Sequence, residues 1–504
     1  MADGPRPQLN AGLDGPRESE SPRIVTLLDL TGRVSLELKN VSDGNCHDYR
    51  TDHAWGKSRW SFSCQKPECA MNTPFKLLLP VLLLLTVPAV VQAQSNPGFT
   101  YTTSGGTITI TGYSGTNGNV AIPTNIGGLT VTSIRSGAFV NSGILANVTI
   151  PATVTNIGTW AFEACSALVS VTIPGSVATI QTGTFDQCNS LMSLTISNGV
   201  TNIADQAFLV CSSLTNVTIP DSVTTIGDYA FENCYSLTNI TLPTGLNRIG
   251  KYGFGFSGLT SITIPNTVTN LGQSAFYGTA LTAVVVPGSV GNLQNQTFSG
   301  CDSLTNASIA NGVRNIGDYA FYQCTSLARV TIPASVTNIG VSAFNGCHSL
   351  PGITIPGSVT KIGDSGFYDC WNLTAVYFQG NAPTLGAFVF AYVWNGYIYY
   401  DWYLTVYYLP GTTGWDAFAA NSHVRTVLWN PQAHADSNFG VLSNRFGFNI
   451  TGTTNIPITV EACTNLAIVA WIPLQTCTLT NGSIYFSDPE WTNHPTRFYR
   501  IRSP

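Results

Sequence analysis

Eight cysteines are the residues whose type and spacing most directly suggest chemistry in this sequence. Each follows a phenylalanine by three residues, and they are Cys165, Cys188, Cys211, Cys234, Cys301, Cys324, Cys347 and Cys370. Neighbouring thiols in an oxidising compartment could form disulfides, or a redox-active or metal-binding strip. Other copies of the same position hold Ser142, Ser257 and Thr279, which indicates a slot for a small, weakly polar group. We therefore interpret these cysteines as buried free thiols that pack like small apolar side chains.

A second set of metal-ligand residue types lies near the N-terminus and comprises Cys46, His47, His53, Cys64 and Cys69. Structural zinc sites place their ligands in short, regularly spaced pairs. The spacing here matches no such pattern, so we predict no metal site.

The sequence offers no recognisable catalytic group. His348 and His423 are the only histidines in residues 94–428, and no nucleophile elbow, phosphate-binding loop or HExxH motif occurs. We predict no catalytic residues and no cofactor. An enzyme that acts on glycans from a repeat scaffold is the least supported of the functions considered.

Residues 71–93 have the pattern of a secretory signal peptide. Lys76 provides the positive start, Leu77–Val91 form a 15-residue apolar core, and small residues precede a predicted cleavage between Ala93 and Gln94. The core is shorter than the about 20 residues that a transmembrane helix needs. We therefore predict export to a secreted or outer-surface location, with membrane contact only through this segment if it stays uncleaved.

Composition and charge narrow the class of protein further. Of the 504 residues, 44% are hydrophobic and 9% charged, which excludes a disordered chain, and the net charge of −5 gives no basic surface for nucleic acid. Residues 1–70 carry 10 acidic and 9 basic side chains, whereas the longer residues 94–428 carry 12 and 7. Since signal peptides begin at translation starts, we interpret Met71 as the true start and residues 1–70 as a mis-assigned, disordered extension.

Most of the chain is a repeat of 23 residues. Its anchor is a phenylalanine, found at Phe139, Phe162, Phe185, Phe208, Phe231, Phe254, Phe276, Phe298, Phe321, Phe344 and Phe367. The spacing is 23 residues throughout, except for 22 before Phe276 and before Phe298. Repeats of such a period predict a solenoid, because one unit cannot bury its apolar residues alone and stacked units can.

The positions within one unit predict its local structure. The unit that starts at Ser170 reads SVTIPGSVATIQTGTFDQCNSLM. Val171 and Ile173 alternate with polar residues, which predicts a short strand with one buried face, and Pro174 ends that strand because it has no N–H to donate. Stacked units predict a mainly β fold, a leucine-rich-repeat solenoid with one continuous parallel sheet over residues 119–379.

The unit pattern L-x-x-V-T-I-P-x-S-V-T-x-I-G-x-x-A-F-x-x-C-x-S resembles the BspA-like leucine-rich repeats of bacterial surface proteins. Members of that family are secreted or surface-exposed, and some act as adhesins. The resemblance therefore implies a secreted or cell-surface protein with a role in binding or adhesion, and it leaves the ligand open.

Each predicted strand has an outward residue between its two buried ones. This residue is usually threonine, and the candidate contact residues are Thr172, Thr195, Thr218, Thr241, Thr263, Thr331 and Thr354. Such a neutral, hydroxyl-rich face could dock an extracellular protein or polysaccharide through many hydrogen bonds. Alternatively the row is purely structural, since the branched Cβ of threonine favours strands.

Segments at both ends of the repeats are expected to cap them. Residues 94–118 alternate around a Gly-Gly pair, which predicts a hairpin cap. Residues 380–428 form an aromatic-rich cap in which an Asn-Gly pair indicates a second hairpin. Trp394 and Trp402 are candidate contact residues there, because exposed aromatic rings bind sugars and proteins; alternatively they cover the last coil.

Residues 429–504 lack the repeat and are expected to form a separate module. Short alternating runs separated by turn residues predict a small β-sandwich. Cys463 and Cys477 either form its one disulfide or remain free thiols. The three basic residues near its end are expected to be solvated: Arg497, Arg500 and Arg502.

Together these features predict a secreted or surface-exposed, non-catalytic binding or adhesion protein that contacts protein or polysaccharide with its repeat sheet. The alternative is a structural envelope protein whose solenoid acts as a spacer or assembles with itself. Fold alone does not choose between these functions.

Overall fold

The computed structural model describes residues 24–28, 34–38, 94–96, 98–395, 397–400, 403–466, 470–494 and 496–502. It divides the chain into two units, Met1–Thr86 and Val87–Pro504. The predicted signal segment up to Ala93 lies outside the described residues, as do Cys46, His47, His53, Cys64 and Cys69. Among the helices described, none has the length and apolar character that crossing a membrane requires.

In the first unit, the structure describes one hairpin. Strand β1 (Ile24–Leu28) pairs antiparallel with β2 (Val34–Leu38). This pairing differs from the disorder expected for residues 1–70, and it arises where the charge-rich stretch contains two short runs of β-branched and leucine residues, which favour strands. The interpretation of this stretch as an extension upstream of the true start stays a prediction.

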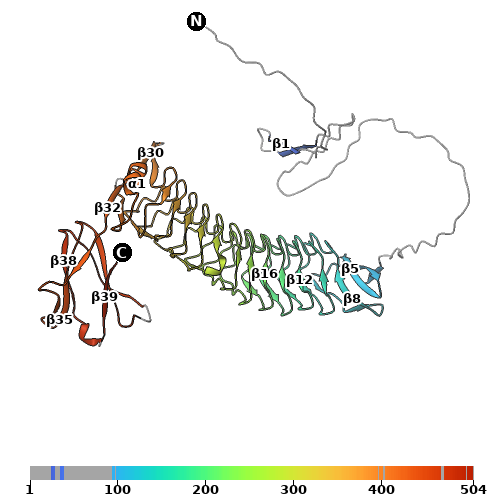
Figure 1. Cartoon of the computed structure of the whole chain (residues 1–504). Coiled ribbons are helices and arrows are strands. Elements are labelled where there is room, and N and C mark those ends of the chain that lie inside the picture. The colour runs from blue at the N-terminus through green and yellow to red at the C-terminus, as the bar shows by residue number, and fades with distance from the viewer. Residues whose placement is uncertain are drawn as a thin grey trace, which may run out of the picture. The chain divides into compact units, whose positions relative to one another are not determined.

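The second unit contains the predicted solenoid, whose coils follow one another from the N-terminal hairpin to strand β32 (Figure 1). Most coils contribute one strand of three or four residues to a parallel ladder. The ladder comprises β6 (Asn119–Ala121), β9 (Asn147–Thr149), β11 (Ser170–Ile173), β13 (Ser193–Ile196), β15 (Asn216–Thr218), β19 (Ala283–Val286), β21 (Asn306–Ile309), β23 (Arg329–Thr331), β25 (Gly352–Ile355), β27 (Ala375–Phe378), β31 (Thr405–Tyr408) and β32 (Arg425–Leu428).

This ladder is not the single continuous sheet that the repeat predicted. It forms three separate sheets, β6–β15, β19–β23 and β25–β32, and residues 239–242 and 261–264 carry no strand between the first two. The interruption falls beside the coil from Phe254 to Phe276, the first of the two that are one residue short. That coil lacks one residue in the turn that leads into residues 261–264, although the Thr260 N–H still donates to the Thr238 carbonyl as the equivalent residues of regular coils do.

A second parallel ladder of two-residue strands follows the next turn of each coil, a turn that starts with proline in most coils. From the sequence we predicted only a second pair of buried apolar residues in this part of the unit, and no strand. The strands are β12 (Thr179–Ile180), β14 (Asn202–Ile203), β16 (Thr225–Ile226), β17 (Arg248–Ile249), β18 (Asn270–Leu271), β20 (Asn292–Leu293), β22 (Asn315–Ile316), β24 (Asn338–Ile339), β26 (Lys361–Ile362) and β28 (Thr384–Leu385). A single-turn 3-10 helix, Gly288–Val290, precedes β20.

The phenylalanine anchors form the centre of the solenoid core. Their rings stack from coil to coil, with centroid separations between 4.8 Å at Phe139–Phe162 and 5.7 Å at Phe367–Phe390. Phe390 is a twelfth anchor, 23 residues after Phe367, that the sequence analysis did not include. The solenoid therefore continues one coil beyond the predicted repeats.

Both ends of the solenoid carry additional elements. At the first end β4 (Phe99–Ser104) and β5 (Thr107–Tyr113) form the predicted hairpin, and β5 pairs in parallel with β8 (Leu129–Ile134). The remaining strands of that sheet are β3 (Gln94–Asn96), β7 (Asn125–Ile126) and β10 (Asn156–Ile157). At the other end β29 (Ala391–Trp394) and β30 (Tyr397–Tyr400) form the second predicted hairpin, and helix α1 (Trp415–Ser422) buries Trp415 and Phe418.

Residues 432–502 form two antiparallel sheets around their own core, in agreement with the predicted β-sandwich. Their elements are β33 (Gln432–His434), β34 (Gly440–Leu442), β35 (Arg445–Thr451), β36 (Pro457–Cys463), β37 (Ile472–Thr478), β38 (Ser483–Asp488), β39 (Phe498–Arg502) and the 3-10 helix Trp491–Asn493. The core includes Trp429, Phe448, Ile458 and Phe486.

Cys463 and Cys477 do not form the disulfide that was one of the two alternatives; both are free thiols. Cys477 lies opposite Ile458 on the neighbouring strand, whereas Cys463 lies five residues further along that strand, opposite Phe498. Five residues of strand span about 16 Å, which is far beyond the reach of a disulfide.

Candidate functional site

The outward threonines form a register-matched row on the first ladder. Thr172 lies opposite Thr149 and Thr195, and Thr195 lies opposite Thr218. Thr331 lies in β23 opposite Ser308. The predicted contact residues Thr172, Thr195, Thr218, Thr241, Thr263 and Thr331 are all exposed, whereas Thr354 is half-buried. We call this row, from Thr149 to Thr354, the threonine face.

Hydrogen bonding distinguishes these threonines from many others of the solenoid. Many threonines in the turns donate their hydroxyls to a carbonyl of the preceding coil, as Thr201 does to Ala178 at 3.1 Å and Thr305 to Thr282 at 2.9 Å. Within the described part of the chain, the hydroxyls of the six exposed contact residues have no such partner: Thr172, Thr195, Thr218, Thr241, Thr263 and Thr331. Their hydrogen-bonding capacity is therefore available to a molecule outside the chain.

The threonine face is neutral along most of its length and changes character at its C-terminal end. Arg329 is the one charged side chain among its outward positions, and Val285 adds an apolar position that is 61% exposed. After Thr354 the outward position passes to Tyr377 and then to Tyr407, which lie opposite each other in register. The face thus ends in aromatic rings.

The cysteine row has no reactive geometry. Each of the eight thiols is buried, free, and donates to the carbonyl of the phenylalanine one coil earlier, as Cys165 does to Phe139 at 3.2 Å. Burial raises the pKa of Cys234 to about 12 and raises the pKa of Cys211 and of Cys347 well above the usual value. Because the thiolate is the nucleophile and the metal ligand, these three thiols are inert at neutral pH. At Cys301 burial also raises the pKa, but hydrogen bonds with Cys324 and Thr279 outweigh that effect and lower it. The row therefore agrees with the interpretation as packing thiols.

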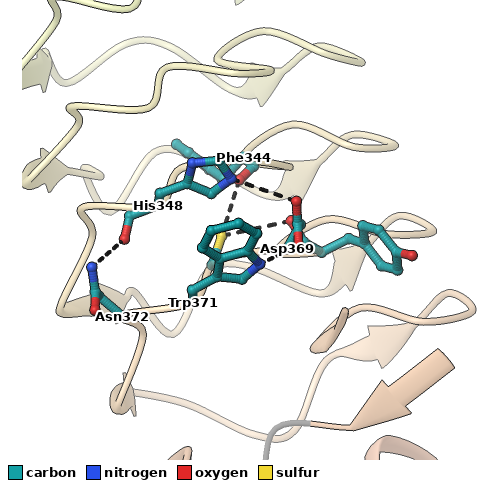
Figure 2. Close-up of polar contacts among 7 residues, drawn as sticks. Phe344, His348, Asp369, Trp371 and Asn372 are labelled. Carbon is teal, nitrogen blue, oxygen red and sulfur yellow. Dashed lines mark hydrogen bonds and ion pairs between the residues drawn. The ribbon is translucent and has the colours of Figure 1, made fainter. Parts of the chain in front are cut away.

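An aromatic and polar cluster lies on a turn edge near the end of the repeats (Figure 2). The rings of His348 and Trp371 stack with centroids 4.4 Å apart, and the Trp371 side chain is 62% exposed. Asp369 accepts a hydrogen bond from the Trp371 indole N–H and lies 3.5 Å from Nε2 of His348. Asn372 Nδ2 donates to the His348 carbonyl at 2.7 Å. The indole is thus held in place while much of its surface stays open to solvent.

The sequence analysis did not identify this cluster as a site. Trp394 occupies the same position of the repeat unit as His348 and Trp371, four residues after the repeat phenylalanine. Its backbone lies opposite Tyr397 at the hairpin turn. Trp402 lies outside the described residues. His348 and Trp371 are 23 residues apart, so the repeat spacing alone could have predicted that their rings stack. His423 lies at the end of α1 against Tyr400, with ring centroids 4.4 Å apart.

A family model described as the BspA type leucine-rich repeat region matches in three overlapping stretches, residues 119–234, 182–305 and 293–399. Together these stretches cover more than half of the chain. The chain belongs to the BspA-type leucine-rich-repeat family. The family match extends to residue 399 and so includes the coil of Phe390.

Solved structures of other leucine-rich-repeat proteins are similar to this BspA-type chain. A leucine-rich cell surface protein from Faecalibacterium prausnitzii shares 27% identity, with 60% of this chain and 95% of that chain covered and a TM-score of 0.41. A leucine-rich-repeat protein from Bacteroides ovatus shares 28% identity, with 67% and 100% covered and a TM-score of 0.44. A comparison with curated proteins found no match.

One carboxyl group inside the BspA-type repeats has an unusual environment. Asp186 is 4% exposed, and its Oδ1 has no hydrogen-bond partner among the described residues. Burial, together with the nearby charge of Glu163, raises the pKa of Asp186 to about 6, although Gln187 opposes the shift by donating to Oδ2. The carboxylate is therefore destabilised in the folded chain at neutral pH.

Replacing this group, Asp186→Asn, is expected to stabilise the repeats by about 1 to 3 kcal/mol at pH 7.5. The folded pKa lies above the unfolded value, so the wild-type chain loses stability as pH rises from about 4 to about 6. The Asn variant lacks that loss, and its stability should match the wild type near pH 4. Urea denaturation at several pH values measures this difference in the free energy of unfolding. Glu163→Gln is the control, and its effect should be smaller because the charge of Glu163 contributes less to the pKa shift than burial does. An unchanged pH profile would contradict the assignment.

Arg500 and Arg502 are exposed as predicted, whereas the Arg497 side chain is only 10% exposed, and all three form ion pairs. Arg500 and Arg502 both bond to Glu461, at 2.6 Å and 2.7 Å, and Arg497 bonds to Asp488 at 2.9 Å. Both carboxylates are about 4% exposed or less, so each needs a cationic partner to offset its desolvation. The sequence showed the arginines but not these partners, because Glu461 lies 39 positions before Arg500 and nothing in the local pattern marks Asp488 as the partner of Arg497.

Among the described residues, no group of three or more His, Cys, Asp or Glu side chains is arranged to hold a metal ion. The surfaces suited to contact are the threonine face, the exposed indole of Trp371 in its cluster with His348, and the tyrosines at the end of the face. These are means of binding through hydrogen bonds and ring stacking.

Proposed function

We propose that this protein is a secreted or surface-exposed, non-catalytic binding protein that contacts an extracellular protein or polysaccharide with its threonine face. The proposal is supported chiefly by one observation, the row of exposed hydroxyls that lack partners within the described chain, whereas many threonines of the neighbouring rows donate to carbonyls of the preceding coil. Membership of the BspA-type family is consistent with a surface location and with adhesion.

The structural alternative, a self-assembling spacer, has less support. Solenoids that assemble end to end need open terminal coils. Here the β4–β5 hairpin covers the first coil, and α1 covers the apolar side of the last coils with Trp415 and Phe418. Both ends are therefore protected against continued stacking of coils.

Introducing charge on the face tests the proposal. The double variant Thr218→Glu and Thr241→Glu, in neighbouring coils, is expected to weaken ligand capture at least about tenfold, because an unpaired charge must be desolvated on contact. The measurement is binding of the purified full chain to an array of glycans and matrix proteins. Folding should be unaffected, since both side chains are exposed.

A matched control uses Thr201→Glu and Thr224→Glu. These residues are also exposed and stacked in neighbouring coils, but they lie outside the threonine face and donate to carbonyls of the preceding coil. Capture by this control should resemble that of the wild type. Absence of any captured component, with concentration-dependent self-association in analytical ultracentrifugation, would contradict the proposal and favour the spacer.

A further inference from the structure

A small groove lies where the threonine face meets the C-terminal sheets. Its volume is about 170 Å³, and the side chains that line it include Tyr377, Gln379, Tyr407, Trp429, Ile501 and Arg502. The two tyrosines continue the outward row of the face beyond Thr354, so the groove is the direct continuation of that row. A molecule lying along the threonines would reach it.

Tyr377 shows that the groove is built for a polar ligand atom. Its side chain is 7% exposed, and its ring stacks on that of Tyr407 with centroids 5.0 Å apart. The Tyr377 hydroxyl has no hydrogen-bond partner in the part of the chain that the structure describes. Burial raises the pKa of Tyr377, so the hydroxyl keeps its proton and can donate it. The hydroxyl is not one of the fully buried polar atoms, so it opens into the groove and can donate to an acceptor on a ligand there.

Arg502 gives the groove a positive charge. Its Nε donates to Oε1 of Glu461 at 2.7 Å, and the side chain stays 45% exposed. Arg500 bonds to the same carboxylate, so two guanidinium groups share one negative charge. Arg500 does not line the groove; it lies over the Trp471 ring at 4.4 Å. None of the lining residues is acidic, so the surplus charge is open to an anionic ligand.

From this arrangement we infer that the groove binds an acidic sugar unit, a pyranose ring that carries a carboxylate, at one end of a polysaccharide held along the threonine face. A cavity of about 150 Å³ accommodates benzene, so this volume suits one six-membered ring. The aromatic walls pack against the ring, Arg502 pairs with its carboxylate, and the Tyr377 hydroxyl donates to a ring or hydroxyl oxygen. The inference rests on the proposed function and selects polysaccharide as the ligand class.

The test is calorimetric titration of the purified full chain with a galacturonic acid trimer and with a neutral galactose trimer. The acidic trimer should bind more tightly than the neutral one. Arg502→Gln should weaken its binding about 10- to 100-fold, because a hydrogen bond to a charged group is lost, and Tyr377→Phe about 3- to 10-fold. Arg500→Gln is the comparison variant: it leaves the lining of the groove intact but removes the surplus positive charge on Glu461, so it should weaken binding of the acidic trimer less than Arg502→Gln does.

The outcomes separate this inference from the proposed function. Equal binding of both trimers, or unchanged affinity for the acidic trimer in Arg502→Gln, overturns the acidic-sugar site. If capture on the array depends on Thr218 and Thr241 but not on Tyr377 or Arg502, the proposed function of the threonine face is supported and the acidic-sugar site is overturned. A larger loss of acidic-trimer binding in Arg502→Gln than in Arg500→Gln, with neutral-trimer binding unchanged in both, supports the groove.

Discussion

Replacing Phe231 by alanine is expected to lower the free energy of unfolding of the solenoid by about 3 to 5 kcal/mol. The ring is fully buried and stacks between those of Phe208 and Phe254, with centroid separations of 5.2 Å and 5.4 Å. Its removal deletes contacts on both sides and leaves a cavity in the middle of the stack. Because each coil contacts chiefly its neighbours, a weak central coil also uncouples the two halves.

Urea denaturation followed by far-ultraviolet circular dichroism measures this loss. Tyr235→Ala is the matched control, because it removes an aromatic ring from the same coil at a position that is 59% exposed. The control should change stability by less than about 1 kcal/mol. Similar losses in the two variants would show that the ring stack is not the centre of the core.

The fold could be predicted because one physical constraint recurs in every coil. Phe231, for example, returns at 23-residue intervals on both sides, and a side chain that must be buried against its own copies predicts stacked coils. The twelfth anchor, Phe390, keeps the same spacing, but it is followed by an aromatic hairpin instead of the usual turn. The limits of the repeat were therefore less predictable than its existence.

The roles of individual threonines could not be predicted in the same way. Thr201 and Thr218 are both exposed threonines of the repeat, yet the first donates to a carbonyl of the preceding coil and the second does not. The difference depends on where the backbone carbonyls of the neighbouring coil point, and residue spacing does not encode that direction. The candidate face was predicted from the sequence, but only the structure shows that its exposed hydroxyls have no partner in the described chain.

The groove at the end of the face illustrates a second limit. Tyr377 and Arg502 are 125 positions apart in the sequence, and they line the same groove only because the C-terminal sheets pack beside the last coils. Nothing in the local pattern around either residue predicts that contact. Long-range packing of non-repeated segments determines this site, and periodicity carries no information about it.

The ion pair of Arg497 with Asp488 joins two residues only nine positions apart, and its loss should be the second large effect on stability. Asp488→Ala is expected to destabilise the C-terminal sheets by about 3 to 5 kcal/mol, because it leaves a buried guanidinium without its partner. The two side chains are 10% and 3% exposed, and Asp488 also accepts from the Tyr499 hydroxyl at 2.8 Å.

Hydrogen exchange measured by mass spectrometry locates this effect. Peptides from β35, β36 and β39 should exchange faster in Asp488→Ala, while peptides from the coils around Phe231 keep the wild-type rate, because the two regions have separate cores. Asp436→Ala is the control, since Asp436 is an exposed acid that bonds to Asn449 in the same sheets. Faster exchange throughout the solenoid would instead mean that the C-terminal sheets support the coils, and that the groove between them forms part of a single cooperative structure.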